Sequence, residues 1–403
     1  MSNEINIGKE VNILKKETKA QIKKVIKKAI HNKELSGLNL VVLNKGEEIY
    51  YHQDGYADKS GKQLITRDCI FRLYSMSKPI TSAAMMILME RGDIDLYDPV
   101  SDFLPGFTDQ IVDEAGRLVP VKRAMTIYEL LTMTSGLVYG GDGLAGKGTE
   151  AIFKKIEDKV LSESESNSES LITTVEAMNA LGKVPLSFHP GDRWEYGTSA
   201  DVLGAVIEVV SGMTFGEFLK KELFIPLKMK DTGFWMNEEQ TKRLATIYTE
   251  HNLAVFSDLK YPPKFESGGA GLNSTLDDYM NFATMLMNGG NFEDKQILKT
   301  ETVNYMTSQI LNEKQMEYFR NWNTLTGHSY GNLMRVVTEP NNGGMLTKKG
   351  EYGWDGWLGC YFANFPNEQV TFLLMMQKVD AGTTSLTRKI RNLLLGDGFM
   401  KGE

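Results

Sequence analysis

A short segment around Ser75 constrains the fold of this chain more than any other feature. Ser75 and Lys78 stand three residues apart, where an aromatic-rich extended segment meets an apolar helix predicted to run to about Met89. Residues three apart share one face of a helix, so the Lys78 amine is expected beside the Ser75 hydroxyl. Pro79 is tolerated because backbone N–H groups in the first turn lack partners anyway. The segment therefore predicts a reactive serine on a rigid, buried support.

The Ser-x-x-Lys spacing is weak evidence by itself. It recurs at Ser257–Lys260, where Pro262 and Pro263 follow and no apolar helix begins, so that copy is interpreted as a loop. Judged from the motif alone, Ser75 is better explained as a helix cap than as a nucleophile. The rest of the chain must decide between the two interpretations.

The bulk composition is that of a folded protein with more than one ordinary core. The chain has 403 residues, of which 41% are hydrophobic and 24% charged, and this suggests two lobes or one elaborated domain. A net charge of −7 argues against a general nucleic-acid surface. The two cysteines, Cys69 and Cys360, exclude a disulfide framework and fit a reducing compartment, but their pairing is left open.

The sequence also predicts where the protein resides. The first ten residues are polar, no apolar core of a secretory signal follows them, and no later run is long and apolar enough to cross a bilayer. A cytoplasmic protein without a membrane span is therefore expected.

The order of predicted elements indicates an α/β (α+β) fold. Residues 38–51 read as two strands around a turn, and residues 356–377 read as a second hairpin. Lysine-rich residues 9–32 are interpreted as a helix over a sheet, in preference to a helix on a membrane surface. From about residue 240 strands and loops are expected to dominate. The prediction is an antiparallel sheet from both ends of the chain, flanked by N- and C-terminal helices, with a mostly helical domain inserted.

The expected boundaries are residues 1–78 and 227–403 for the sheet domain and 79–226 for the helical domain. Ser75 then falls at the junction, where active-site clefts tend to lie.

Two other motifs have weaker support. Gly327–Gly331 is a literal G-x-S-x-G around Ser329, but it lacks the buried strand before it and the helix after it that a nucleophile elbow needs. The glycine run Gly141–Gly146 is interpreted as a flexible loop, because no clear strand precedes it. None of the five histidines has metal-ligand spacing to another, and no metal or organic cofactor is implied.

Six segments, taken in chain order, resemble those of one known family, the serine β-lactamase and penicillin-binding-protein-like hydrolases of the class C type. The segments are Phe71–Ala84, Leu130–Leu137, Pro190–Tyr196, Met229–Phe234, Gly268–Leu272 and Gly353–Gly356. The resemblance covers about residues 37 to 378 and implies a β-lactamase/transpeptidase-like fold. Carboxylesterases and acyltransferases belong to this family.

The resemblance implies a set of catalytic roles. Ser75 would be the nucleophile that carries an acyl-enzyme, and Lys78 and Tyr196 would form a coupled base and acid. The backbone N–H groups of Ser75 and Trp357 would form the oxyanion hole. Free lysine and tyrosine titrate near ~10.4 and ~10, so burial or neighbouring charge must lower one of them for work at neutral pH. Which of the two is the base stays open at this point.

Departures from the family pattern bear on the substrate. The implied substrate-binding residues are Tyr139, Thr198, Trp354, Asp355 and Gly356. Thr198 replaces an asparagine of the family motif and lacks its amide donor and acceptor. Trp354-Asp355-Gly356 replaces a Lys-Thr-Gly, so the lysine that would meet a substrate carboxylate is absent and an aspartate that would repel it is present.

Three functions remain, in order of preference. The first is a carboxylesterase or acyltransferase acting on small or medium acyl esters. The second is a β-lactamase or D,D-peptidase of the same fold. The third is a catalytically silent protein that uses the cleft to bind a ligand. The expected partner is in each case a small molecule, an ester or amide for the enzymes, and the oligomeric state is not specified by the sequence.

Overall fold

A computed structural model of the protein describes residues 13–163, 172–248, 261–379 and 382–398. The second Ser-x-x-Lys copy, Ser257–Lys260, lies outside the described residues. The helices are α1 (Lys16–His31), α2 (Ser77–Arg91), α3 (Ile127–Leu131), α4 (Gly143–Glu163), α5 (Thr174–Leu181), α6 (Ser199–Ser211), α7 (Phe215–Leu219), α8 (Glu238–Thr241), α9 (Leu276–Met287), α10 (Thr300–Met306), α11 (Glu313–Phe319) and α12 (Ser385–Gly396). The strands are β1 (Gly37–Asn44), β2 (Glu47–Gly55), β3 (Ile70–Arg72), β4 (Ile111–Glu114), β5 (Arg117–Pro120), β6 (Asn273–Thr275), β7 (Asn291–Phe292), β8 (Lys295–Gln296), β9 (His328–Tyr330), β10 (Arg335–Val337), β11 (Tyr352–Asp355), β12 (Tyr361–Phe365) and β13 (Val370–Met376).

A seven-stranded sheet joins the two ends of the chain. Its strand order is β2-β1-β13-β12-β11-β10-β9, and all of its neighbouring strands run antiparallel. Strand β1 therefore lies beside β13, which follows it by more than 300 residues. The antiparallel sheet predicted from both ends of the chain is confirmed.

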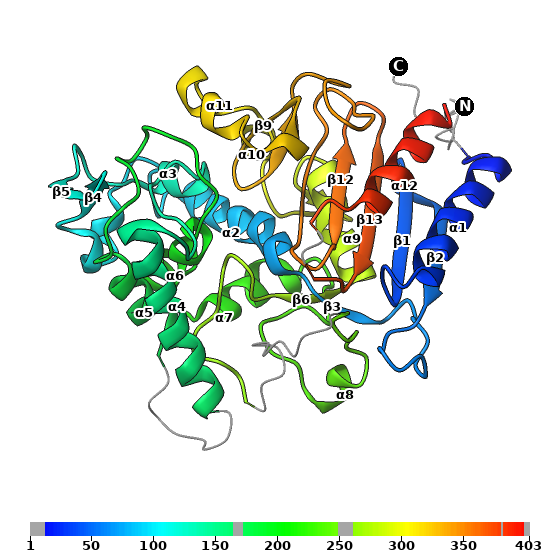
Figure 1. Ribbon diagram of the computed structural model, residues 1–403, viewed down its shortest axis with the longest axis horizontal. Helices are drawn as coiled ribbons and strands as arrows, with labels where there is room; N and C mark the ends of the chain where they lie inside the picture. The colour runs from blue at the N-terminus through cyan, green and yellow to red at the C-terminus, as the bar shows by residue number, and fades with distance from the viewer. Residues whose placement is uncertain (1–12, 164–171, 249–260, 380–381, 399–403) are drawn as a thin grey trace, which may run out of the picture.

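Alternating side chains place the central strands between two hydrophobic layers. In β1, Leu38, Leu40 and Val42 pack into the core under α1 and α12, while Val41 and Leu43 face the larger core that contains α2 and α9. Successive side chains of a strand point to opposite faces, so a strand buried on both faces is apolar throughout. Figure 1 shows α1 and α12 side by side over the outer face of this sheet.

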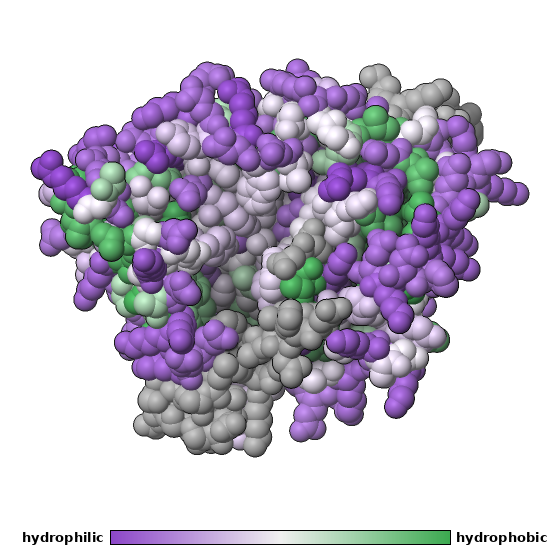
Figure 2. Space-filling model, viewed as in Figure 1, coloured by the Kyte–Doolittle hydropathy of each residue, from purple (hydrophilic) through white to green (hydrophobic). Residues whose placement is uncertain are grey.

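Helix α1 has the packing expected from its sequence. Ile22, Ile26 and Ala29 are buried in the layer against the sheet, whereas most of the lysines between them are exposed. Because its apolar face is covered, the helix needs no membrane surface to bury it. The face of the molecule shown in Figure 2 is mainly hydrophilic.

Two expectations, one about the glycine run Gly141–Gly146 and one about the chain after residue 240, were wrong. The glycine run does not form a loop throughout, because α4 begins at Gly143 and includes Gly146. The chain after residue 240, where strands and loops were expected to dominate, also contains the helices α9 to α11. Helices α10 and α11 have seven residues each, and so few turns bury too few side chains to produce a recognisable period.

The cysteines and helices bear on two further expectations. Cys69 and Cys360 are both free thiols, and both are buried. Among the described residues, no single helix is long and apolar enough for a membrane span. Ser199–Ser211 and Phe215–Phe224 would be long and apolar enough only together, and they are bent by 79° relative to each other.

Candidate active site

Ser75 lies in a tight turn directly before the buried helix α2. The turn is a 3₁₀ helix, Tyr74–Met76, so Ser75 precedes the first residue of α2 instead of lying within it. Tyr74 has a φ of +46°, a left-handed conformation that is rare outside glycine. The strained residue turns the chain from β3 into the helix and leaves Ser75 partly exposed in front of the rigid, apolar α2.

Lys78 is fully buried beside Ser75. Its Nζ atom lies 3.2 Å from Ser75 Oγ, 2.9 Å from Tyr139 Oη and 2.8 Å from the carbonyl oxygen of Gly269. Burial lowers the pKa of Lys78 to about 8, although the negative charges of Asp201 and Asp355 oppose this shift. Roughly one molecule in ten then carries a neutral lysine at pH 7, which makes Lys78 a usable base.

The glycine-rich segment before β6 fixes one of these lysine contacts. Asp201 of α6 accepts hydrogen bonds from Ser267 Oγ at 2.5 Å and from the Gly269 N–H at 3.1 Å. A side chain at Gly269 would collide with the Asp201 carboxylate, because a Cβ there would lie 2.8 Å from Oδ2. Asp201 thus holds the Gly269 carbonyl against Lys78. Its role was not predicted from the sequence, although an acidic side chain in an apolar helix was a signal for it.

Tyr196 completes the contacts around Ser75. Its hydroxyl is directed toward Ser75 and accepts a 3.0 Å hydrogen bond from Trp354 Nε1. Burial raises the pKa of Tyr196 above that of free tyrosine, while the neighbouring Ser75 hydroxyl and the Trp354 N–H act in the opposite direction. The Lys78 amine lies over the Tyr196 ring, 4.8 Å from its centroid. Tyr196 is therefore neutral at pH 7.

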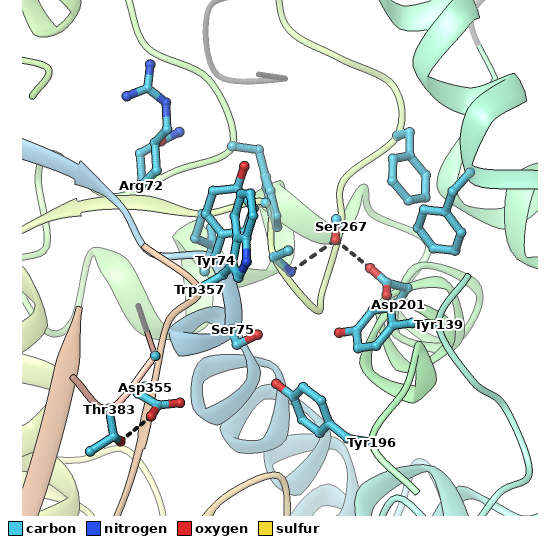
Figure 3. Close-up of a pocket in the computed structure, with 18 of the residues that line it drawn as sticks. Arg72, Tyr74, Ser75, Tyr139, Tyr196, Asp201, Ser267, Asp355, Trp357 and Thr383 are labelled. Atoms are coloured by element: carbon cyan, nitrogen blue, oxygen red, sulfur yellow. Dashed lines mark hydrogen bonds between the residues drawn. The ribbon is translucent and has the colours of Figure 1, made fainter. Parts of the chain in front are cut away.

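These side chains lie at a cavity of about 760 Å³ between the sheet and the helical part of the chain. Figure 3 shows the side chains of Ser75, Tyr139 and Tyr196 directed toward one another. Much of the remaining wall is aromatic or apolar, and most of it was not anticipated from the sequence. These wall residues are Tyr74, Phe153, Phe234, Pro263, Phe265, Leu272, Trp322 and Trp357. They come from many separate elements, so no single sequence window could reveal them.

The segment after β11 closes the cavity beside Ser75. A Cβ at Gly356 would lie 2.2 Å from the carbonyl oxygen of Leu73, so only glycine lets this segment approach the serine turn so closely. Trp357 follows and packs on Tyr74, with ring centroids 5.2 Å apart. Asp355 lines the same wall and accepts a hydrogen bond from the Thr383 hydroxyl.

The predicted residues differ in how directly they reach this cavity. Ser75, Tyr139, Tyr196, Asp355 and Trp357 line it. Lys78, Trp354, Gly356 and Thr198 are not among the lining residues: Lys78 touches Ser75, Trp354 touches Tyr196 and Gly356 packs on Leu73. Thr198 is fully buried at the start of α6, and its hydroxyl has no hydrogen-bond partner among the described residues.

The alternative serine is placed elsewhere. Ser329 is fully buried in β9, and its hydroxyl donates to Met316 Sδ at 3.2 Å. Within the described parts of the chain, no group of three or more His, Cys, Asp or Glu side chains is placed to hold a metal ion.

Comparisons with known proteins identify the family to which the chain belongs. The chain is 30% identical over 362 residues to Protein Rv1367c of Mycobacterium tuberculosis, covering 85% of this chain and 86% of the relative. It is 31% identical over 283 residues to Esterase EstB of Burkholderia gladioli, covering 65% and 68%. The solved structure of EstCE1, described as a hydrolase with promiscuous acyltransferase activity, superimposes with a TM-score of 0.75 at 24% identity, covering 94% and 98%. Residues 22–396 match the Beta-lactamase family as a whole, and the chain belongs to that family.

Proposed function

We propose that this protein is a serine carboxylesterase that forms an acyl-enzyme on Ser75. The observation that carries the proposal is the 3.2 Å contact between Ser75 Oγ and a fully buried Lys78 whose pKa falls to about 8. A serine hydroxyl becomes a good nucleophile only when a base takes its proton. Lys78 is the base in this proposal, because burial shifts its pKa toward neutrality and shifts that of Tyr196 away from it.

The proposed reaction has two stages. Ser75 Oγ attacks the acyl carbon while its proton moves to the neutral Lys78 amine, and the resulting tetrahedral intermediate collapses as the leaving alcohol takes up a proton. Water then attacks the acyl-enzyme, with the same groups reversing their roles. The carboxylic acid leaves and Ser75 recovers its proton.

The oxyanion hole belongs to the same proposal. The backbone N–H groups of Ser75 and Trp357 would donate to the carbonyl oxygen as it gains negative charge. Support comes from the close approach of Gly356 to Leu73, which brings the start of the Trp357 segment against the serine turn. The Tyr74–Trp357 ring contact holds the two segments together.

The cavity wall favours an apolar acyl ester over a β-lactam. Phe153, Phe234 and Phe265 offer apolar surface to an acyl group. Asp355 places a carboxylate in the wall, where it would repel the carboxylate of a penicillin-like substrate. Relatives named as esterases are consistent with this choice. The promiscuous acyltransferase activity of EstCE1 suggests acyl transfer as a second activity, in which an alcohol replaces water at the second stage.

The test is the intact mass of the protein after brief exposure to an activated acyl ester, with Ser75→Ala as the matched variant. An acyl-sized gain in the wild type alone supports the proposal. Equal gains in both proteins would contradict it and point to another nucleophile, and no gain in either would favour the ligand-binding alternative. A chromogenic cephalosporin on the same preparation then separates esterase from β-lactamase, since only the latter turns it over.

A further inference from the structure

Four polar side chains gather at one place beside the cavity, and Lys78 is hydrogen-bonded to two of the other three. Lys78 Nζ contacts Ser75 Oγ at 3.2 Å and Tyr139 Oη at 2.9 Å. The hydroxyls of Tyr139, Tyr196 and Ser75 are directed toward one another in Figure 3, and the rings of Tyr139 and Tyr196 meet edge to face with centroids 5.6 Å apart. Lys78 meets Tyr196 through the face of its ring, so the hydroxyl of Tyr139 is what links the lysine amine to the Tyr196 hydroxyl.

The N–H groups and the lone pair of the lysine amine give these contacts a direction. A neutral amine has two N–H groups and one lone pair. The Gly269 carbonyl can only accept, so it takes one N–H at 2.8 Å. When Tyr139 accepts the second N–H, the lone pair is left facing Ser75. In this arrangement the Tyr139 O–H points to the Tyr196 hydroxyl, which faces it in Figure 3, so that the Tyr139 oxygen is free to accept from Lys78.

Because Lys78 is buried, its proton needs a relay to reach the cavity. Lys78 is fully buried and is not among the residues that line the cavity, whereas Tyr139 and Tyr196 both line it. A proton taken from Ser75 by Lys78 therefore needs a hydroxyl that reaches the cavity before it can meet a leaving group. Burial also raises the pKa of both tyrosines, so each starts and ends the cycle neutral.

We propose that Tyr139 relays the proton from Lys78 to Tyr196, from which it reaches the leaving alcohol. The ammonium of Lys78 gives a proton to Tyr139 Oη as the Tyr139 proton passes to Tyr196 Oη. The Tyr196 proton passes to the leaving oxygen as its bond to the acyl carbon breaks. One proton has then moved from Lys78 to the alcohol, and both tyrosines are again neutral. This step rests on the proposed acyl-enzyme at Ser75.

The test is Tyr139→Phe, which removes the hydroxyl and keeps the ring. Two esters with the same acyl group are compared, one with an alkyl alcohol and one with nitrophenol, in single-turnover acylation with the protein in excess. An alkoxide needs a proton to leave, but nitrophenolate does not. The rate of acylation by the alkyl ester is expected to fall by about 100-fold. The rate of acylation by the nitrophenyl ester is expected to fall by less than about 10-fold.

Tyr74→Phe is the matched control, because it removes another tyrosine hydroxyl from the wall of the same cavity. It is expected to change the two acylation rates in equal proportion. An equal fall for both esters in Tyr139→Phe would overturn the relay and leave Tyr139 a structural role, and no fall for either ester would overturn it as well. If the wild type is acylated by neither ester, it is the proposed function that fails. Nitrophenyl acylation of Tyr139→Phe shows in the same experiment that the variant is folded.

Discussion

Two buried basic side chains in this molecule, Arg391 and Lys78, differ in whether their hydrogen-bond partners carry a charge. Arg391 on α12 and Glu351 before β11 are both fully buried, and two hydrogen bonds of 2.7 and 2.8 Å join them. Lys78 is buried just as completely, yet the three oxygens that hydrogen-bond to it among the described residues belong to a serine, a tyrosine and a carbonyl group. These partners carry no charge in the resting protein.

The difference shows that, when burial is equal, the partner decides in which direction the pKa moves. In the ion pair, Arg391 holds the pKa of Glu351 below its usual value despite the opposing effect of burial. Around Lys78 the effect of burial dominates and the pKa falls to about 8, because Asp201 and Asp355 act only at longer range. The first arrangement preserves a charge, and the second creates a group that can gain and lose a proton.

The same substitution at the two sites should therefore have opposite consequences, with the largest effect at Lys78. Lys78→Met removes the proposed base but leaves no buried carboxylate newly unpaired, because Asp201 keeps its bonds to Ser267 and Gly269. We expect kcat/KM for esters to fall by about 1000-fold while the melting temperature stays the same or rises. Ester kinetics and thermal unfolding of one preparation measure both. Retained activity would exclude Lys78 as the base.

Arg391→Met should do the reverse. It leaves Glu351 buried without its partner, and we expect the free energy of unfolding to fall by about 3–5 kcal/mol in urea titrations. Activity per folded molecule should be unchanged. The exposed Lys389→Met on the same helix is the matched control and should have almost no effect. A further Glu351→Leu substitution should restore much of the loss, and its failure to do so would show that the charge is not the cause.

The sequence allowed only one of these two sites to be predicted. Ser75 and Lys78 share one turn, so their contact follows from their spacing, and the ordered segments of a known family added Tyr196. Arg391 and Glu351 meet only because α12 packs over the sheet, and no short sequence pattern around either residue predicts that they form an ion pair. The same holds for the antiparallel sheet and the cavity: alternating apolar strands were recognisable, whereas side chains brought together from many separate elements were not.

The pH dependence of catalysis tests how long-range charge tunes Lys78. Only neutral Lys78 can take a proton, so kcat/KM should rise with pH and level off above about 8. Asp201 favours the protonated amine, so Asp201→Asn should move the rising limb of the plot of kcat/KM against pH to lower pH. The asparagine keeps the oxygen that accepts from Ser267 and Gly269. Asp192→Asn changes a carboxylate that pairs with surface lysines, and it should leave the limb in place. A limb that moves upward in Asp201→Asn would contradict the assignment to Lys78.

The smallest effect is expected at Asp355, whose charge should affect the choice of substrate more than the pKa of Lys78. Asp355→Asn removes a negative charge from the cavity wall and keeps an acceptor for the Thr383 hydroxyl. An ester whose acyl group ends in a carboxylate should then gain about fivefold in kcat/KM relative to its neutral analogue, which corresponds to ~1 kcal/mol of relieved repulsion. The pH limb should move down as in Asp201→Asn but less, because Asp355 is the weaker of the two influences on Lys78. If the preference between the two esters does not change, the Asp355 carboxylate is neutral in the working protein, and the preference for esters must then come from the shape of the aromatic wall.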